Sequence, residues 1–390
     1  MLTPKRILVT NGRYPITLDL MRNLSSCGHE LYLAETQNIN LCRFSNVVKG
    51  HFLVPSPRFH PKKNLKALID IIKKEKIDLF IPIWEDVFLI SKNLSKFPSY
   101  CKVFCKEYSL LNTLHNKSKF MDFLQSLDIL TPKTHYINNK SQLKKINLPS
   151  YALKACYSRA SLQVYLMNKN TPMPNIAPTK KKPWIAQEWL EGNNYCSFSI
   201  CLDGKVQAHT AYPMEFVMKS KKIMSSTVGS YCLSFRSIAH KKILKWVENF
   251  VQKTNFTGHL AFDFIELDDG RLFAIECNPR TTSGICLFSK EDRIDRAYFI
   301  NSIDRIDTQT NTQKQIAIAN LLFGWQSALA CHKFPLYLSN IFKSQDVIFN
   351  KKDLRPFFMQ PLLWINQLCY SLRVKKNVIE AFTYDVDFNG

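Results

Sequence analysis

Glycine, acidic residues and long apolar runs are all scarce in this 390-residue sequence. With only 11 glycines, the chain contains no complete G-x-G-x-x-G pattern, which argues against a glycine-rich dinucleotide site. Every apolar run is interrupted by Lys, Asp or Pro before it reaches the roughly 20 residues that a membrane-spanning helix needs. We therefore expect no membrane span.

Cysteine is present in number, but its spacing is irregular. The 12 Cys lack the close, regular spacing of a disulfide framework, which fits a reducing compartment. Cys101 and Cys105 are four residues apart, yet no matching Cys or His pair lies nearby, so the pattern gives little support to a zinc site. A strand predicted at residues 6–10 leaves no room for a signal peptide before it. We therefore expect a cytoplasmic protein.

Acidic residues are outnumbered, since 53 Lys and Arg against 31 Asp and Glu give a net charge of +22. One interpretation is nucleic-acid binding, because neutralising phosphates drives that affinity. The other is a solvated basic surface that attracts polyanions in general, nucleotides included. We favour the second, because the sequence contains no recognisable nucleic-acid module and its lysine clusters are scattered. They lie at residues 62–66, 73–76, 179–182, 219–222 and 374–376.

Short apolar strands alternate with amphipathic helices over residues 1–112. Such alternation predicts a parallel sheet with both faces covered by helices. The first strand runs into Gly12-Arg13, and ligands in open α/β sheets gather at the carboxyl ends of strands. Gly12 is equally explained as a turn that the backbone requires. We expect strands near 6–10, 30–34, 78–82 and 101–105, and helices near 15–27 and 64–76.

The most informative stretch is residues 259–280, HLAFDFIELDDGRLFAIECNPR. Two aromatic and aliphatic runs flank Asp269-Gly270, a pattern typical of a tight β-hairpin. A two-residue loop there sets Asp263 opposite Glu276, and strand alternation puts Asn278 on the same face. The other side chains expected on that face are apolar: Ala261, Ile265, Leu267, Leu272 and Ala274.

Two carboxylates side by side on an apolar surface repel each other unless a cation neutralises them. Asp, Glu and Asn oxygens suit Mg²⁺ or Mn²⁺, which leave positions for water and phosphate oxygens. Arg280 adds a positive charge at the rim. An ordinary hairpin with one solvated face is the alternative, but the apolar neighbours favour the metal site. The prediction depends on register, since one more loop residue would send Asp263 and Glu276 to opposite faces.

Asp263 followed by Glu276-Cys277-Asn278-Pro279-Arg280 resembles the metal-binding end of ATP-grasp enzymes. These include the carbamoyl-phosphate synthetase large chain, biotin carboxylase and D-alanine–D-alanine ligase. The resemblance covers about residues 1–290 and implies an α/β protein with the ATP-grasp fold. A Rossmann-like domain would span residues 1–112 and a C-terminal extension of unknown role 301–390. Between them, an ATP-grasp domain over 113–300, with its small lobe at about 148–188, would hold two α+β lobes around the ATP cleft.

The same resemblance assigns contacts to the phosphates. Lys117 matches a nucleotide-contacting Lys, and we expect Asn116 to cap the helix that begins there and runs to Leu127. Lys154, on a strand at 151–156, matches the Lys that meets the α/β-phosphates. The glycine-rich flap of the family is replaced by residues 157–161, which contain no Gly, and Arg159 would act there as a charged clamp. Either the flap is remodelled or phosphoryl transfer is impaired.

The resemblance also implies an adenine site between the two lobes. Backbone groups of Gln187, Glu188 and Leu190 would hold the base, with an ordinary core strand as the alternative. The acid that binds ribose in the family is replaced by Asn194, whose amide still bonds a hydroxyl. Gly12-Arg13 would face the substrate.

Together these residues predict an ATP-dependent ligase. ATP would lie between the lobes, with Mg²⁺ or Mn²⁺ on Asp263, Glu276 and Asn278, and Arg280 would stabilise the transferring group. A carboxylate would be activated as an acyl phosphate and attacked by an amine, releasing ADP and phosphate. The alternatives are a catalytically weakened ATP-binding module and, ranked last, a basic nucleic-acid-binding protein. The identity of the substrates stays open, as does the oligomeric state, for which a homodimer is allowed.

Residues beyond 300 contain no recognisable motif. Their apolar pattern predicts a helix near 315–331. The stretch Tyr384-Asp385-Val386-Asp387 alternates like a strand, and we expect its two acids to be solvated.

Overall fold

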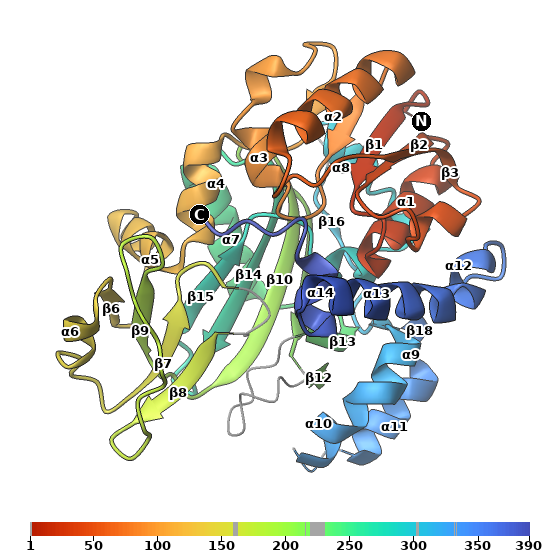
Figure 1. Cartoon of the computed structure of the whole chain (residues 1–390). Helices are drawn as coiled ribbons and strands as arrows, with labels where there is room; N and C mark the ends of the chain where they lie inside the picture. Colours follow the sequence, from red (N-terminus) through yellow and green to blue (C-terminus); the bar gives the residue numbers. More distant parts are fainter. Residues whose placement is uncertain are drawn as a thin grey trace.

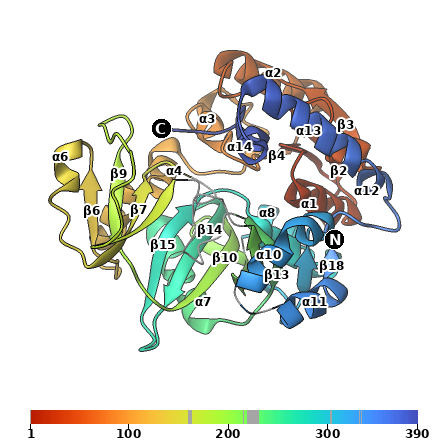
Figure 2. The same cartoon turned by 60° about the horizontal axis from the view of Figure 1, so that its bottom comes forward.

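Four β-sheets organise the described part of the chain (Figure 1). Figures 1 and 2 place the small sheet of strands β6 to β9 and the C-terminal helices α10 and α11 on opposite sides of a large central sheet. No helix in the described ranges is both long enough and apolar enough to cross a bilayer. The computed structural model describes residues 2–158, 163–214, 216–218, 231–301, 304–330, 332 and 334–390.

The first sheet is entirely parallel and has the order β3-β2-β1-β4-β5. Its central strand is buried on both faces, because Ile7 and Val9 enter one hydrophobic core and Leu8 the other. The strands and helices predicted before residue 106 are confirmed. Strand β3 was missed, because Lys49-Gly50-His51 interrupts its apolar pattern at the sheet edge. The elements are β1 (Arg6–Thr10), α1 (Pro15–Ser26), β2 (Glu30–Glu35), β3 (Val48–Leu53), α2 (Pro61–Glu75), β4 (Leu79–Ile81), α3 (Val87–Ser91), β5 (Lys102–Val103) and α4 (Tyr108–His115).

The small sheet is antiparallel, with the order β6-β9-β7-β8. It has its own hydrophobic core, built around Leu153, Ile137 and Ala186. This core is separate from those under the other sheets, so the small sheet and the large sheet pack as distinct lobes. The elements are α5 (Lys117–Ser126), β6 (Thr134–Ile137), α6 (Lys140–Leu143), β7 (Ser150–Ala155), β8 (Val164–Asn168) and β9 (Trp184–Glu188).

The large sheet has the order β15-β14-β10-β11-β16, and β15 is an edge strand. Helices α5 and α7 cover one of its faces through an aromatic cluster, in which the Phe250 ring lies 6.5 Å from Phe120 and 5.1 Å from Phe262. Strands β10 and β11 form a hairpin around Asp203-Gly204. The elements are β10 (Asn193–Leu202), β11 (Lys205–Pro213), α7 (Lys241–Thr254), β14 (Gly258–Glu266), β15 (Leu272–Asn278), α8 (Arg296–Phe299) and β16 (Ile306–Asp307).

The β14–β15 hairpin keeps the predicted acid pair but reaches it differently. Leu267 pairs with Arg271, so the loop holds three residues instead of two, with Gly270 at φ +82° in the left-handed region. A β-bulge at Ile275 then takes up the extra residue and restores Asp263 opposite Glu276. The predicted neighbours were therefore partly wrong. Ala274 pairs with Phe264 and lies in the core with Cys277, on the face away from the acids.

The C-terminal residues return to the first sheet. The predicted strand at 384–387 was wrong: this segment follows helix α14, and Asp385 is buried in an ion pair with Arg13 instead of being solvated. The predicted helix near 315–331 is confirmed as short helical segments in succession. The elements are β12 (Phe216–Met218), β13 (Tyr231–Arg236), β17 (Gln313–Gln315), α9 (Ala317–Ala319), a π-helical turn (Asn320–Gly324), α10 (Trp325–Ala330), α11 (Phe334–Lys343), β18 (Gln345–Asp346), α12 (Arg355–Phe358), α13 (Gln360–Val374) and α14 (Val378–Thr383).

Candidate nucleotide and metal site

Two carboxylates face each other on neighbouring strands of the large sheet. Asp263 on β14 pairs with Glu276 on β15, and Cys196 on β10 donates its thiol to Asp263 Oδ1 at 3.2 Å. Burial, and then the charge of Glu276, raise the pKa of Asp263 to about 6. The side chain of Glu276 is 22% exposed. Solvent screens the repulsion between the two carboxylates only in part, so a cation that binds both of them would stabilise the pair.

Lys117 reaches this pair from the start of helix α5. Asn116 caps that helix as predicted, its side chain accepting hydrogen bonds from the amides of Ser118 and Lys119. Because α5 packs beside the edge strand β15, the buried Lys117 Nζ lies 3.1 Å from Glu276 Oε1. It also donates to the backbone oxygen of Ser158 at 2.7 Å, which links the large sheet to the segment after β7.

Lys154 approaches the same place from the small sheet. It is buried on β7, and its Nζ donates to Oε1 of Gln187 on β9 at 2.8 Å. Burial lowers the pKa of Lys154 to about 8, and the charge of Lys117 acts in the same direction, while Glu276 and Asp263 oppose it. The two lobes therefore bring two lysines and two acids into one electrostatic cluster. We call Lys117, Lys154, Asp263 and Glu276 the cleft cluster.

The cleft cluster fits a hard divalent cation. In the described part of the chain, no three His, Cys, Asp or Glu side chains gather as a complete metal cage. The oxygen donors present are instead the two carboxylates and the amide of Asn278, which lies on the same face of β15 two residues beyond Glu276. Such a partial oxygen set suits Mg²⁺ or Mn²⁺, because these ions take their remaining ligands from water and phosphate.

Arg280 lies beside the donor set and is held rigidly. Its guanidinium stacks over the Trp84 ring, 3.8 Å from the ring centroid, and Nη2 donates to Asn278 Oδ1 at 3.2 Å. Nε lies 3.9 Å from Glu85 Oε1, is buried and has no hydrogen-bond acceptor among the described residues. A buried guanidinium with a donor to spare is suited to an anionic ligand.

The predicted adenine residues lie where β9 leaves the small sheet for β10. The backbone amide of Glu188 donates a hydrogen bond to Lys133 O, and that of Trp189 donates to Ser150 O. The Leu190 amide, by contrast, has no acceptor within the described ranges. A Cβ on Gly192 would lie 2.3 Å from Glu266 O, so glycine is required where this connection crosses the large sheet. Asn194 lies opposite Ile265 on β14, at the rim of the same sheet.

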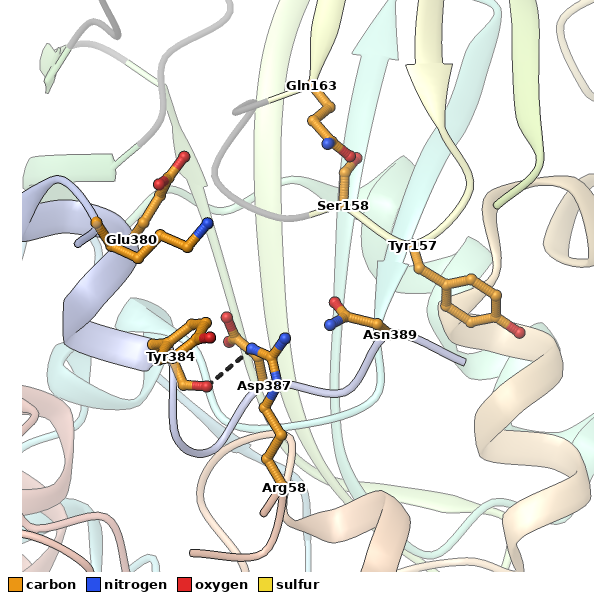
Figure 3. Close-up of a pocket in the computed structure, with 9 residues that line it drawn as sticks. Arg58, Tyr157, Ser158, Gln163, Glu380, Tyr384, Asp387 and Asn389 are labelled. Carbon is orange, nitrogen blue, oxygen red and sulfur yellow. Dashed lines mark hydrogen bonds between the residues drawn. The ribbon is translucent and has the colours of Figure 1, made fainter. Parts of the chain in front are cut away.

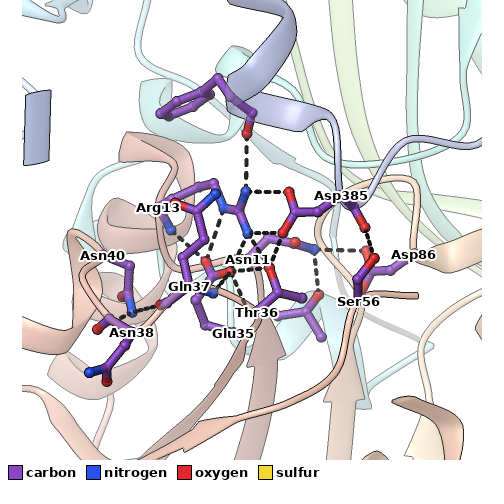
Figure 4. A network of polar contacts seen from close by, with 12 residues as sticks. Asn11, Arg13, Glu35, Thr36, Gln37, Asn38, Asn40, Ser56, Asp86 and Asp385 are labelled. Atoms are coloured by element: carbon purple, nitrogen blue, oxygen red, sulfur yellow. Dashed lines mark hydrogen bonds and ion pairs between the residues drawn. The ribbon is translucent and has the colours of Figure 1, made fainter. Parts of the chain in front are cut away.

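Arg159, the proposed clamp in the flap, lies outside the described residues. Arg13, expected to face substrate, is instead buried and engaged: it pairs with Glu35 at 2.5 Å and with Asp385 at 2.7 Å (Figure 4). Its guanidinium joins the C-terminal segment to the first sheet, and Gly12 beside it packs against Leu33.

The residues that follow strand β4 also border the site, although no sequence pattern predicted them. Trp84 holds Arg280, and the buried Glu85 lies 3.8 Å from His115 and accepts the amide of Phe388 at 2.7 Å. Their position was a usable signal, because polar residues at the carboxyl end of a central parallel strand are typical ligand-binding groups. The contact with Phe388, 303 residues away, had no local signal.

The C-terminal tail closes a pocket of about 170 Å³ beside the cleft cluster. Residues of helix α14 and the tail lie across the pocket from Ser158 (Figure 3). The backbone oxygen of Ser158 accepts the hydrogen bond from Lys117 Nζ. The lining carries both signs of charge. It consists of Arg58, Tyr157, Ser158, Gln163, Lys376, Glu380, Tyr384, Asp387 and Asn389.

Comparison with known proteins identifies the central part of the chain. Residues 114–284 match the ATP-grasp domain family. An uncharacterized protein of Methanocaldococcus jannaschii is 26% identical over 190 residues, which cover 48% of this chain and 45% of that protein. The aligned stretch is thus less than half of that relative.

Solved structures share the fold over most of the chain. The ADP complex of an N5-carboxyaminoimidazole ribonucleotide synthetase superposes with a TM-score of 0.61 at 14% identity, covering 80% of this chain and 81% of that one. An L-amino acid ligase from Bacillus licheniformis gives a TM-score of 0.55 at 12% identity, covering 73% and 69%. These similarities confirm the predicted α/β fold with an ATP-grasp architecture. Residues 114–284 of the chain therefore form a domain that matches the ATP-grasp family, and the solved structures extend the similarity in fold to most of the chain.

Proposed function

We propose that the protein is an ATP-dependent ligase that joins a carboxylate to an amine and releases ADP and phosphate. The observation that carries this proposal is the cleft cluster: Lys117 and Lys154, from different lobes, converge on the facing acids Asp263 and Glu276. The names of the similar structures, an L-amino acid ligase and an N5-carboxyaminoimidazole ribonucleotide synthetase, agree with this class of reaction.

Each residue of the cleft cluster has a role in nucleotide binding. Lys117 and Lys154 neutralise phosphate oxygens between the lobes, and the backbone at Glu188 to Leu190 receives the base, with Asn194 near the ribose. Asp263, Glu276 and Asn278 hold Mg²⁺, which when bound offsets the charge of the β- and γ-phosphates. The lysines and acids compensate each other without nucleotide, so the site keeps its charges in place at modest electrostatic cost.

The reaction follows from this placement. A carboxylate oxygen of the substrate attacks the γ-phosphorus while the bond to the β–γ bridging oxygen breaks, which gives an acyl phosphate and ADP. The amine nitrogen then attacks the acyl carbon, the carbon–oxygen bond to phosphate breaks, and the amine loses a proton. Arg280, fixed by Trp84, stabilises negative charge on the transferring phosphoryl group. The chain needs no covalent nucleophile.

The pocket under the C-terminal tail is a suitable place for the substrate that lies next to the phosphates. Ser158 borders both the pocket and the Lys117 ammonium. Arg58 and Lys376 offer positive charge and Glu380 negative charge, which suits a small molecule that carries a carboxylate and an amine.

A panel assay tests the proposal. The full chain is incubated with ATP, Mg²⁺ and pairs of carboxylates and amines, and ADP, phosphate and amide product are measured. We expect equimolar release of all three with a subset of pairs, and a loss of about 10²–10³-fold in kcat for Arg280→Gln. Arg271→Gln, on the exposed hairpin tip, is the matched control and keeps its activity.

A catalytically weakened ATP-binding module is the second candidate, favoured by the absence of any Gly between residues 151 and 191. Without glycine in this segment, fewer backbone amides can approach a phosphate closely. Nucleotide binding without turnover over the whole panel would support this candidate and reject the ligase.

A further inference from the structure

The exposed large apolar side chains are concentrated in one part of the chain. Among the described residues, 21 such side chains are exposed, and 15 of them lie between residues 321 and 372. A soluble monomer rarely exposes large contiguous apolar patches, so this concentration needs an explanation. We define the apolar face as these 15 side chains: Leu321, Leu322, Trp325, Leu329, Leu336, Leu338, Phe342, Phe349, Leu354, Phe358, Leu362, Trp364, Ile365, Leu368 and Leu372.

Helix α13 is inverted relative to an ordinary surface helix. Its buried side chains are Gln360, Gln367 and Ser371, all polar. The outward stripe has helical spacing and consists of Leu362, Ile365, Leu368 and Leu372, the last 71% exposed. The helix thus turns most of its large apolar side chains away from the protein, with the exception of Leu363, which packs against the core.

Helix α11 also exposes large apolar side chains, although Phe334 and Ile341 pack partly buried beside Tyr337. It buries Tyr337 and Asn340, while Leu338 is exposed and Phe342 is 86% exposed. The aromatic rings of Phe323 and Trp364 lie 6.4 Å apart and join the π-helical turn before α10 to α13. This contact places the segment before α10 beside α13. Leaving the exposed apolar side chains in water is unfavourable in proportion to their area.

The charge of this part of the chain favours an anionic partner. Residues 321–376 contain eight Lys or Arg, two Asp and no Glu. Both acids are engaged: Asp353 pairs with Arg22 at 2.9 Å, and Asp346 accepts the amides of Ala317 and Phe349. A second copy, with the same excess of basic residues and a net charge of +22, would be repelled. An anionic surface would be attracted.

We propose that the apolar face binds the surface of a bilayer that contains anionic phospholipids. The outward side chains of α11 and α13 enter the boundary between headgroups and acyl chains, and the surrounding lysines and arginines contact the phosphates. Trp325 and Trp364 suit this boundary, because indole combines an apolar ring with a polar N–H. The proposal gives residues beyond 320 a role that is independent of the ligase chemistry.

Vesicle flotation tests the proposal with the full chain. We expect the protein to float with vesicles of phosphatidylglycerol and phosphatidylcholine in equal parts, and much less with phosphatidylcholine alone. The double variant Ile365→Glu/Leu372→Glu is expected to lose about tenfold or more of its partitioning. The matched control Leu53→Glu/Leu130→Glu places the same charges on exposed apolar positions elsewhere and keeps binding. Unchanged melting temperatures show that both variants fold.

Two outcomes would overturn the proposal. If Ile365→Glu/Leu372→Glu floats as well as the wild type, binding is due to charge alone and not to the apolar face. If the wild type does not float but sediments as a dimer that the same variant dissociates, the apolar face is covered by a second copy of the chain.

Discussion

At the scale of single residues, the cleft cluster is a balance of buried charges. Lys117 and Glu276 form a close pair, whereas burial raises the pKa of Asp263 and lowers the pKa of Lys154, so that it favours the neutral form of both. When these groups are charged, such pKa shifts lower the stability of the ligand-free fold. A bound phosphate and cation would offset this loss. Residues adapted to a ligand in this way should be suboptimal for stability without it.

The variant Asp263→Asn tests this balance. The folded-state pKa of Asp263 is about 6, above its ordinary value of 3.8, so the ionised side chain destabilises the ligand-free fold above pH 6. This penalty disappears below about pH 4, where the group is protonated in both states. We expect Asp263→Asn to stabilise the protein by about 1–3 kcal/mol at pH 7.5 and to have little effect at pH 4.

Thermal melting at the two pH values, without nucleotide or divalent ions, measures this difference. Asp269→Asn on the exposed tip of the same hairpin is the control, and it gives no gain because Arg271 lowers the pKa of Asp269. An Asp263→Asn variant that melts below the wild type at pH 7.5 would contradict the account.

At the scale of elements, most strands that carry the site residues could be predicted from the sequence, because their apolar patterns are local. It predicted the pairing of Asp263 with Glu276 from a two-residue loop, and the pair forms only because a bulge at Ile275 compensates for a longer loop. Periodicity cannot detect such a bulge, since it carries no composition signal. Strand β3 was missed for a related reason, because an edge strand tolerates polar residues.

The N-cap of helix α5 carries an element-scale prediction. Asn116 is buried and accepts two backbone amides, and it sets the position from which Lys117 reaches Glu276. Asn116→Ala should lower the free energy of unfolding by about 1 kcal/mol and weaken nucleotide binding. Asn139→Ala removes a cap from the short exposed helix α6 and is the control, with a smaller effect. Urea unfolding followed by circular dichroism makes the comparison, and equal losses in both variants would count against the role of Asn116.

At the scale of the whole molecule, C-terminal residues pack against the N-terminal sheet and its first helix. Arg13 next to the first strand pairs with Asp385, and Arg22 on α1 pairs with Asp353, so C-terminal side chains complete the N-terminal sheet's surroundings. The prediction that Asp385 is solvated was wrong, because its partner Arg13 lies 372 residues away and no local pattern indicates it. Long-range ion pairs of this kind are the part of the fold that pattern reading cannot reach.

Breaking one of these pairs should loosen the C-terminal region. Burial opposes the charge of Asp385, but Arg13 holds the pKa of this carboxyl below its usual value. Its stabilising effect is thus present above about pH 4 and is lost as the pH falls further. Asp385→Asn leaves Arg13 buried with fewer partners and should cost about 3 kcal/mol at pH 7.

Thermal melting measures the loss for Asp385→Asn, and the exposed Asp304→Asn is the control. The difference between Asp385→Asn and the wild type should shrink on acidification. A difference that is constant from pH 7 to pH 3 would speak against an ionic contribution.

Calorimetric titration of the full chain with a non-hydrolysable ATP analogue tests the central claim most directly. The account predicts Mg²⁺-dependent binding to the wild type, binding weakened at least about tenfold in Lys154→Met and in Glu276→Gln, and unchanged binding in Lys181→Met, whose side chain is exposed. A wild-type chain that binds no nucleotide, or a Lys154→Met variant that binds it as tightly as the wild type, would contradict the account.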